Sequence, residues 1–231
     1  MLLLAVAVTF FSFKYRIIFD IDLTMLSIAI IFPLVFAIRG SFRRREKALE
    51  HLSQFRSALK TLHYFMKSDG GLPEAKQHEL NDILVNISEK TMEFLESKTD
   101  DTTKLDETLD RVHGFIIANR SMINTKLRDR LLRFMNDLHE SLENLIAISL
   151  HRTPMSLKAY CKVFIYLFPI IYAPTIISHV GLDTNQQFTY FIVLLTQFIL
   201  ITLYNIQDQL EYPFDDDGLD DIKLHVFKID R

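Results

Sequence analysis

Tryptophan is absent from the 231-residue sequence, and cysteine occurs once, as Cys161. A single cysteine excludes an intramolecular disulfide and cannot by itself form a cysteine-based metal site. The eight histidines are scattered and form no HExxH pair, so we interpret them as packing or surface residues. The net charge of −3 leaves no basic footprint for nucleic acid. Because no nucleophile, base and orienting group occur as a set, we do not expect an enzyme.

Charged residues are also scarce in four apolar stretches, although hydrophobic residues make up 49% of the chain. The stretches comprise residues 1–13, 23–38, 163–182 and 188–206. We expect each to form a membrane helix, the first extending as far as Phe19, and the last two to form a hairpin. Charges gather between residues 39 and 152 and after residue 207, which predicts a membrane protein with a long soluble insert.

The second stretch contains three bulky apolar residues spaced by four, Ile28, Phe32 and Phe36. An uncharged helix of its length covers about 24 Å, short of the ~30 Å hydrocarbon core, but Arg39 at its end can snorkel. A four-residue spacing puts the three side chains on one helix face. That face either packs against neighbouring helices or forms a hydrophobic constriction of a pore.

A basic cluster ends this stretch and consists of Arg39, Arg43, Arg44 and Arg45. Lysine and arginine mark the cytoplasmic side of a membrane helix, so the cluster predicts a cytoplasmic exit. The same charges could instead raise the anion concentration at the inner mouth of a pore. The helix is expected to continue into the cytosol until the turn at residues 69–71.

Apolar residues recur at helical spacing through the charged region, over residues 49–62, 80–95, 105–116 and 127–145. Such faces bury against each other, which predicts an all-α fold with a large cytosolic helical bundle. We therefore expect two membrane helices in residues 1–39, a cytosolic helical domain in 40–157, two more membrane helices in 158–206 and a cytosolic acidic tail in 207–231. Both termini are expected in the cytoplasm.

The tail carries aspartates at positions 215–217 and 220–221 around Gly218. An acidic run is usually a solvated tail. The preceding pair Pro213-Phe214, however, is an apolar anchor that a free tail does not need. Carboxylates around a glycine could also bind Ca²⁺ through oxygen, although the order is not that of an EF-hand.

Three segments, in this order, resemble the bestrophins, a family of pentameric anion channels. Residues 28–46 resemble the neck and the start of the long second helix. Residues 152–160, RTPMSLKAY, resemble the family's RTPIPLAY element, and residues 208–217, DQLEYPFDDD, resemble its QLxNPF segment with the following acidic residues. The expected topology resembles the family over nearly the whole chain.

The resemblance implies a homopentameric channel in the lipid bilayer that passes chloride or other small anions. It implies a pore neck at Ile28, Phe32 and Phe36 and a cytosolic constriction at Met155. In animal members the acidic run forms a calcium clasp. The corresponding ligands here would be the side chains of Asp217 and Asp220 and the backbone carbonyls of Gln209 and Tyr212.

Several alternatives stay open at this point. Tyr212 and Asp215 replace the usual Asn and Gly, and Lys158 interrupts the second motif. The end of the tail is nearer to the bacterial pattern, and bacterial members need no calcium. A shifted register would place Ile30, Leu34 and Ile38 on the pore. A cation channel of the same fold and a membrane-anchored interaction protein without a pore are the alternative functions.

Overall fold

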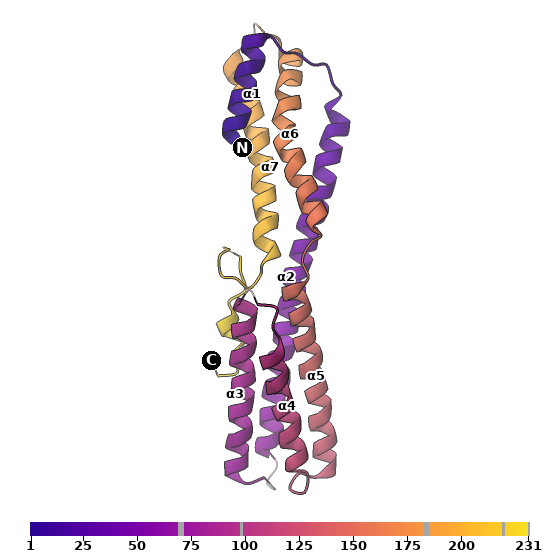
Figure 1. Cartoon of the computed structure of the whole chain (residues 1–231), viewed down its shortest axis with the longest axis vertical. Coiled ribbons are helices and arrows are strands. Elements are labelled where there is room, and N and C mark those ends of the chain that lie inside the picture. Colours follow the sequence, from indigo (N-terminus) through magenta and orange to yellow (C-terminus); the bar gives the residue numbers. More distant parts are fainter. Residues whose placement is uncertain (69–71, 98, 183–184, 219, 231) are drawn as a thin grey trace. The chain divides into compact units, whose positions relative to one another are not determined.

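The computed structural model of the chain describes residues 1–68, 72–97, 99–182, 185–218 and 220–230. Every regular element within these residues is helical (Figure 1). The helices are α1 (Leu2–Tyr15), α2 (Leu23–Ser68), α3 (Glu74–Glu96), α4 (Thr103–Ala118), α5 (Thr125–Leu150), α6 (Met155–Val180), α7 (Gln186–Glu211) and the short 3₁₀-helix η1 (Leu224–Phe227). The all-α prediction is confirmed, whereas the predicted turn at residues 69–71 lies outside the described residues.

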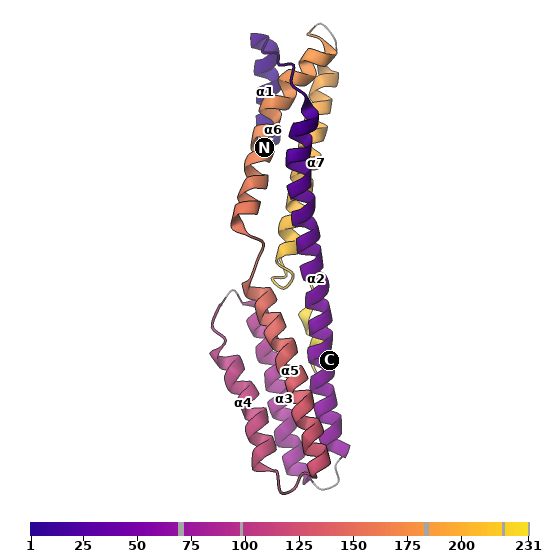
Figure 2. The same cartoon turned by 90° about the vertical axis from the view of Figure 1, so that its right-hand side faces the viewer.

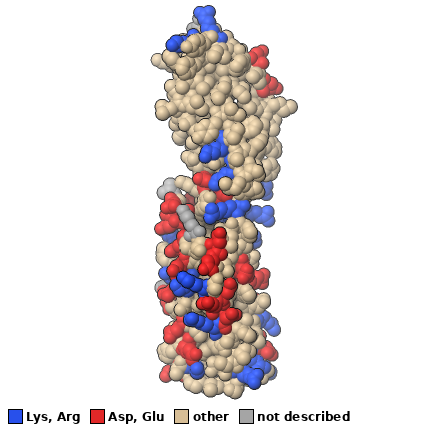
Figure 3. All heavy atoms as spheres, in the orientation of Figure 1, with Lys and Arg blue, Asp and Glu red and all other residues tan. Residues whose placement is uncertain are grey.

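The chain forms two compact units, each built from two separate segments. The first contains Met1–Arg43 and Thr153–Glu211, and the second contains Arg44–Arg152 and Tyr212–Arg231. In the first unit α1, α6 and α7 lie side by side, as Figures 1 and 2 both show. On the face drawn in Figure 3, few charged side chains cover this unit, whereas lysines, arginines and acidic residues cover the second.

Three stretches of helix in the described chain are long and apolar enough to cross a membrane. They lie within Leu23–Lys67, Thr125–Val180 and Gln186–Glu211. These stretches support a multi-pass membrane protein. The helix α1 is apolar but has only 14 residues, so it covers about 21 Å and does not reach the length of a full span. The number of spans found by length and composition is therefore three rather than the expected four.

The ends of the apolar helices differ from the predicted ones for local reasons. The helix α1 stops at Tyr15 because Arg16 adopts a left-handed conformation, with φ of 51°, and does not extend to Phe19. The helix α6 begins at Met155, directly after Pro154, and α7 continues to Glu211. Residues before a proline avoid the α conformation, which explains why α7 ends one residue before Tyr212-Pro213.

The second unit is a helical bundle with an apolar core, formed by the later part of α2 with α3, α4 and α5. Phe55, Leu84, Val112 and Leu131 are among its fully buried residues. The chain after α7 adds four more buried side chains to the same core, from Phe214, Ile222, Leu224 and Ile229. The predicted anchor at Phe214 is thus confirmed, and a freely solvated tail is excluded.

Backbone groups of the tail also bind the bundle. The Arg56 side chain donates from Nε to the carbonyl of Lys228 at 3.1 Å. The backbone N–H of Ile229 donates to Ser88 Oγ at 3.1 Å, in a buried hydrogen bond. The tail is therefore part of the folded second unit along most of its length.

Candidate functional site

The exposed face of α2 in the first unit carries the three predicted neck residues. Ile28, Phe32 and Phe36 are 48%, 58% and 59% exposed, and the rings of Phe32 and Phe36 lie 5.9 Å apart. Ile30 and Leu34, from the alternative register, are each 1% exposed and pack against Cys161, Ile165, Phe168 and Leu200. The alternative register therefore does not describe the exposed face of α2, because Ile30 and Leu34 belong to the apolar core of the first unit.

The four arginines of the predicted basic cluster differ in exposure and in their contacts. Arg39 and Arg43 belong to the first unit and are exposed, so their charges are open to solvent. Arg45 belongs to the second unit, where its Nε donates to the carbonyl of Asp220 at 2.7 Å. Arg44 is half-buried in the same unit. Arg39 and Arg43 are therefore the most exposed charges of the cluster, and a role of the four arginines in attracting anions stays a prediction.

The first unit also contains an ion cluster that joins two segments of the family resemblance. Lys158 Nζ lies 2.6 Å from Asp208 Oδ1 and 2.9 Å from Glu211 Oε2. The Glu211 side chain is only 2% exposed, and it also accepts hydrogen bonds from the N–H of Thr153 at 3.1 Å and from Gln207 Nε2 at 3.0 Å. Gln207 Nε2 lies 3.3 Å from the buried hydroxyl of Ser41 in α2. The cluster thus connects α6, α7 and α2.

Lys158 lies five residues before the uncharged stretch 163–182, so its charge lies outside the apolar part of α6. Burial alone would lower the pKa of its ammonium group, but the hydrogen bonds and charges of Asp208 and Glu211 outweigh burial and raise the pKa above its ordinary value. Lys158 therefore stays charged at every physiological pH. In the sequence analysis, Lys158 was noted only because it interrupts the second motif. A lysine next to an uncharged stretch indicates, however, that its charge is paired with a buried acidic side chain.

A second contact between the two motifs lies in the second unit. The guanidinium carbon of Arg152 is 4.6 Å from the centroid of the Tyr212 ring. A guanidinium over a tyrosine face is attracted by the ring's negative face. The ring of Tyr212 therefore contacts the first residue of the RTPMSLKAY segment.

Met155, the predicted cytosolic constriction, is the first residue of α6 and is 79% exposed. The residue follows Pro154, and its side chain does not belong to the apolar cores formed by the described residues. The described residues thus leave most of this side chain uncovered. Its role as a constriction stays a prediction.

The predicted calcium ligands do not form a cluster with a third acidic or histidine residue anywhere in the described chain. Asp217 and Asp220 are exposed, the Asp220 carbonyl accepts from Arg45, and Gln209 lies in the last turn of α7. Instead, Asp221 Oδ2 accepts from the N–H of Gly218 at 2.6 Å. The calcium site therefore stays a prediction, which a comparison of thermal stability with calcium and with a chelator would test.

Burial, followed by the nearby carboxylates of Asp215 and Asp216, raises the pKa of Asp221 above its ordinary value, although the Gly218 hydrogen bond opposes the rise. The acidic residues of the loop therefore repel each other at neutral pH. Within the described residues, no lysine or arginine forms an ion pair with Asp221, and the hydrogen bond from Gly218 is the contact that opposes the rise in its pKa.

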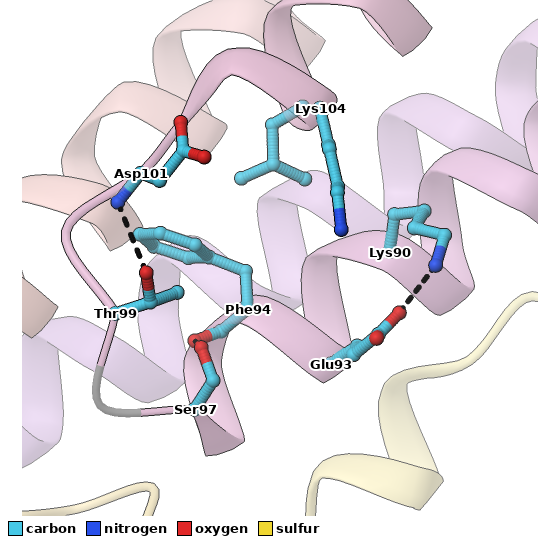
Figure 4. Close-up of a pocket in the computed structure, with 8 residues that line it drawn as sticks. Lys90, Glu93, Phe94, Ser97, Thr99, Asp101 and Lys104 are labelled. Carbon is cyan, nitrogen blue, oxygen red and sulfur yellow. Dashed lines mark hydrogen bonds and ion pairs between the residues drawn. The ribbon is translucent and has the colours of Figure 1, made fainter.

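A small cleft of about 150 Å³ lies between the end of α3 and the start of α4 in the bundle (Figure 4). Lys90 pairs with Glu93 at 2.5 Å, and the Ser97 hydroxyl donates to the Phe94 carbonyl at 2.8 Å. The Asp101 N–H donates to Thr99 Oγ1 at 3.3 Å, and the Asp101 carboxylate accepts from Thr103. Because these polar groups bind one another, the cleft carries no argument for catalysis.

The chain was compared with known proteins. A comparison with protein-family models found no match, and a comparison with curated protein sequences found none either. Solved structures do match. A mutant of a bacterial bestrophin homologue from Klebsiella pneumoniae is 17% identical, with a TM-score of 0.82, over 98% of this chain and 92% of that one. A further structure of the bacterial bestrophin homologue from the same organism is 14% identical, with a TM-score of 0.81, over 98% and 91%.

A third match, described only as a membrane protein mutant, is 16% identical and has a TM-score of 0.83 over 98% of this chain and 92% of the other. At these identities the likeness establishes the fold. The resemblance inferred from three short segments is therefore confirmed at the level of the whole chain, which has the fold of the bacterial bestrophin homologues.

Proposed function

We propose that the chain is one subunit of a bestrophin-like ion channel that conducts chloride or other small anions passively through a hydrophobic neck. The observation that carries the proposal is the division of α2 into two faces. One face, with Ile30 and Leu34, is buried in the subunit, whereas Ile28, Phe32 and Phe36 are left exposed. Copies of the chain around one axis would turn this exposed face into stacked apolar rings.

A narrow apolar ring opposes water and so gates by dewetting. The edges of aromatic rings carry partial positive charge, which favours a passing anion over a cation. The exposed side chains of Arg39 and Arg43, at the end of the same helix, would raise the local concentration of anions. Met155 would form the second, cytosolic constriction.

The proposed assembly is a homopentamer in a lipid bilayer, with α1 as the fourth, short membrane helix. The second unit and both termini would lie in the cytoplasm, because positive residues at the end of the α2 span favour that side. A ring of five would place five copies of the exposed α2 face around the axis. The mass of the purified complex should then be five times the 27.0 kDa of the chain. A monomer or dimer would remove the proposal.

The direct test of conduction is ion flux from liposomes that contain the purified protein. We expect chloride or iodide flux that depends on the protein and rises in Phe32→Ala. A membrane-anchored interaction protein would give no flux, and a cation channel of the same fold would pass potassium instead.

A further inference from the structure

Proline in the middle of α2 leaves one backbone carbonyl without its helical donor. Pro33 has no N–H group, so the carbonyl of Ala29, four residues earlier, loses its hydrogen bond within the helix. In a membrane an unpaired carbonyl is costly because no water replaces the donor. The structure supplies a donor from another helix: the Tyr160 hydroxyl of α6 lies 3.2 Å from the Ala29 oxygen.

The same arrangement occurs a second time in the first unit. Pro169 in α6 frees the carbonyl of Ile165, and Gln197 Nε2 of α7 donates to this carbonyl at 3.2 Å. Gln197 is completely buried, so its amide is directed to this bond rather than to solvent. No described side chain donates to the carbonyl of Ile170, which Pro174 frees. Two proline-freed carbonyls therefore have dedicated donors on a neighbouring helix.

The bond to Ala29 lies at the proposed neck. Pro33 follows Phe32 directly and precedes Phe36 by three residues, so a bend at Pro33 changes how these two rings are directed. The Tyr160 ring is itself held by Phe164, at a centroid distance of 4.4 Å. Phe164 packs against the core that contains Ile30 and Leu34 of α2.

We propose that Tyr160 is a positioning residue of the pore helix: its hydroxyl replaces the donor that Pro33 removes and thereby fixes the bend of α2 at the neck. The proposal rests on the proposed function, because only a pore-lining α2 makes the bend matter for conduction. A change in the bend of α2 at Pro33 would lengthen or break this bond, so the bond would stabilise the conformation seen here over others. A single hydrogen bond between membrane helices shifts such a balance by about three- to tenfold.

The test is a double-mutant cycle between Tyr160 and Pro33. In Pro33→Ala, residue 33 regains its N–H and pairs with the Ala29 carbonyl, so the Tyr160 hydroxyl is no longer needed. We expect Tyr160→Phe to change the ratio of open to closed channel by about three- to tenfold when Pro33 is present. In the Pro33→Ala background the same change should have less than about a twofold effect. Pro33→Leu supplies the same N–H if Pro33→Ala does not assemble.

Tyr166→Phe is the matched control, because Tyr166 lies on the same helix, is 43% exposed and makes no hydrogen bond through its hydroxyl within the described chain. It should leave the open-to-closed ratio unchanged in both backgrounds. An equal effect of Tyr160→Phe in both backgrounds, or no effect in either, overturns the proposal.

Thermal unfolding in detergent separates this proposal from the proposed function. It is measured on the native chain, Tyr160→Phe, Pro33→Ala and the double variant. If none of them conducts, the channel function fails, yet the cycle on melting temperature still tests the hydrogen bond. Tyr160→Phe should lower the melting temperature only when Pro33 is present. Additive effects in unfolding would show that Tyr160 does not serve the carbonyl that Pro33 frees.

Discussion

Removal of the Lys158 charge should destabilise the first unit, and the structure sets the size of the effect. In Lys158→Met, Asp208 is exposed and can be solvated, but Glu211 stays buried with its negative charge. Removing one partner of a buried ion pair costs about 3–5 kcal/mol. Glu211 keeps the N–H of Thr153 and the amide of Gln207, and Lys158 is 15% exposed, so we expect a cost of about 2–3 kcal/mol.

The assay is thermal unfolding of the detergent-solubilised protein, in which 1 kcal/mol corresponds to about 2–4 °C for a chain of this size. Lys162→Met is the matched control, since Lys162 lies one turn further on α6, is exposed and makes no ion pair with the described residues. The double variant Lys158→Met with Glu211→Gln removes the buried charge and should recover most of the loss.

The pH dependence follows from the raised pKa of Lys158. A raised pKa in the folded state means that the stabilisation is fully present below the unfolded lysine value of about 10.4 and is lost as pH rises through the higher folded value. The difference between the native chain and Lys158→Met should therefore be constant between about pH 6 and 9. If Lys158→Met is as stable as Lys162→Met, or if Glu211→Gln gives no recovery, the cluster does not hold α6 to α7.

Three further predictions concern the neck, the tail and the acidic loop. Phe32→Ala should raise conductance without loss of assembly. Leu34→Ala, at a buried position, should instead lower the free energy of unfolding by about 2–5 kcal/mol and give no gain in current. Larger currents from Leu34→Ala than from Phe32→Ala would contradict the assignment of the two faces of α2. Phe214→Ala should destabilise the bundle by about 3–5 kcal/mol in chemical unfolding, because Phe214 is only 5% exposed and belongs to the bundle core. An unchanged unfolding midpoint would show that Phe214 does not anchor the tail. Since the native pKa of Asp221 is raised, the native state holds its proton more tightly, and stability should fall as pH rises from the unfolded value of about 3.9 through the raised native value. Asp215→Asn should reduce this fall in stability and raise the melting temperature at neutral pH. If Asp215→Asn has the melting temperature of the native chain at both acidic and neutral pH, the repulsion is refuted.

Much of the fold was predictable because its signals are local. The uncharged stretches, the helical spacing in the bundle and the Pro213-Phe214 anchor each depend on a few neighbouring residues. The end of α1 was misjudged because apolar residues continue to Phe19, whereas the left-handed conformation of Arg16 ends the helix earlier.

The site was predictable only in part, because its contacts join distant segments. Periodicity alone allowed both registers of α2, because the four-residue spacing is equally regular whether it starts at Ile28 or at Ile30. The two registers are distinguished by the packing of Ile30 and Leu34 against α6 and α7. Lys158 meets partners about fifty positions later in the chain, and Tyr160 reaches Ala29 across 131 positions. A sequence shows that Pro33 frees a carbonyl, but the identity of the donor depends on tertiary structure.

The reversal potential across a planar bilayer with a tenfold potassium chloride gradient tests the central claim most directly. An anion-conducting neck predicts a reversal potential close to the chloride equilibrium potential, about 59 mV from zero. At zero applied potential, where the gradient alone drives a current, Phe32→Ala should increase that current while the assembly stays intact. A reversal potential of the opposite sign would show cation conduction, and the absence of protein-dependent current would contradict the channel itself.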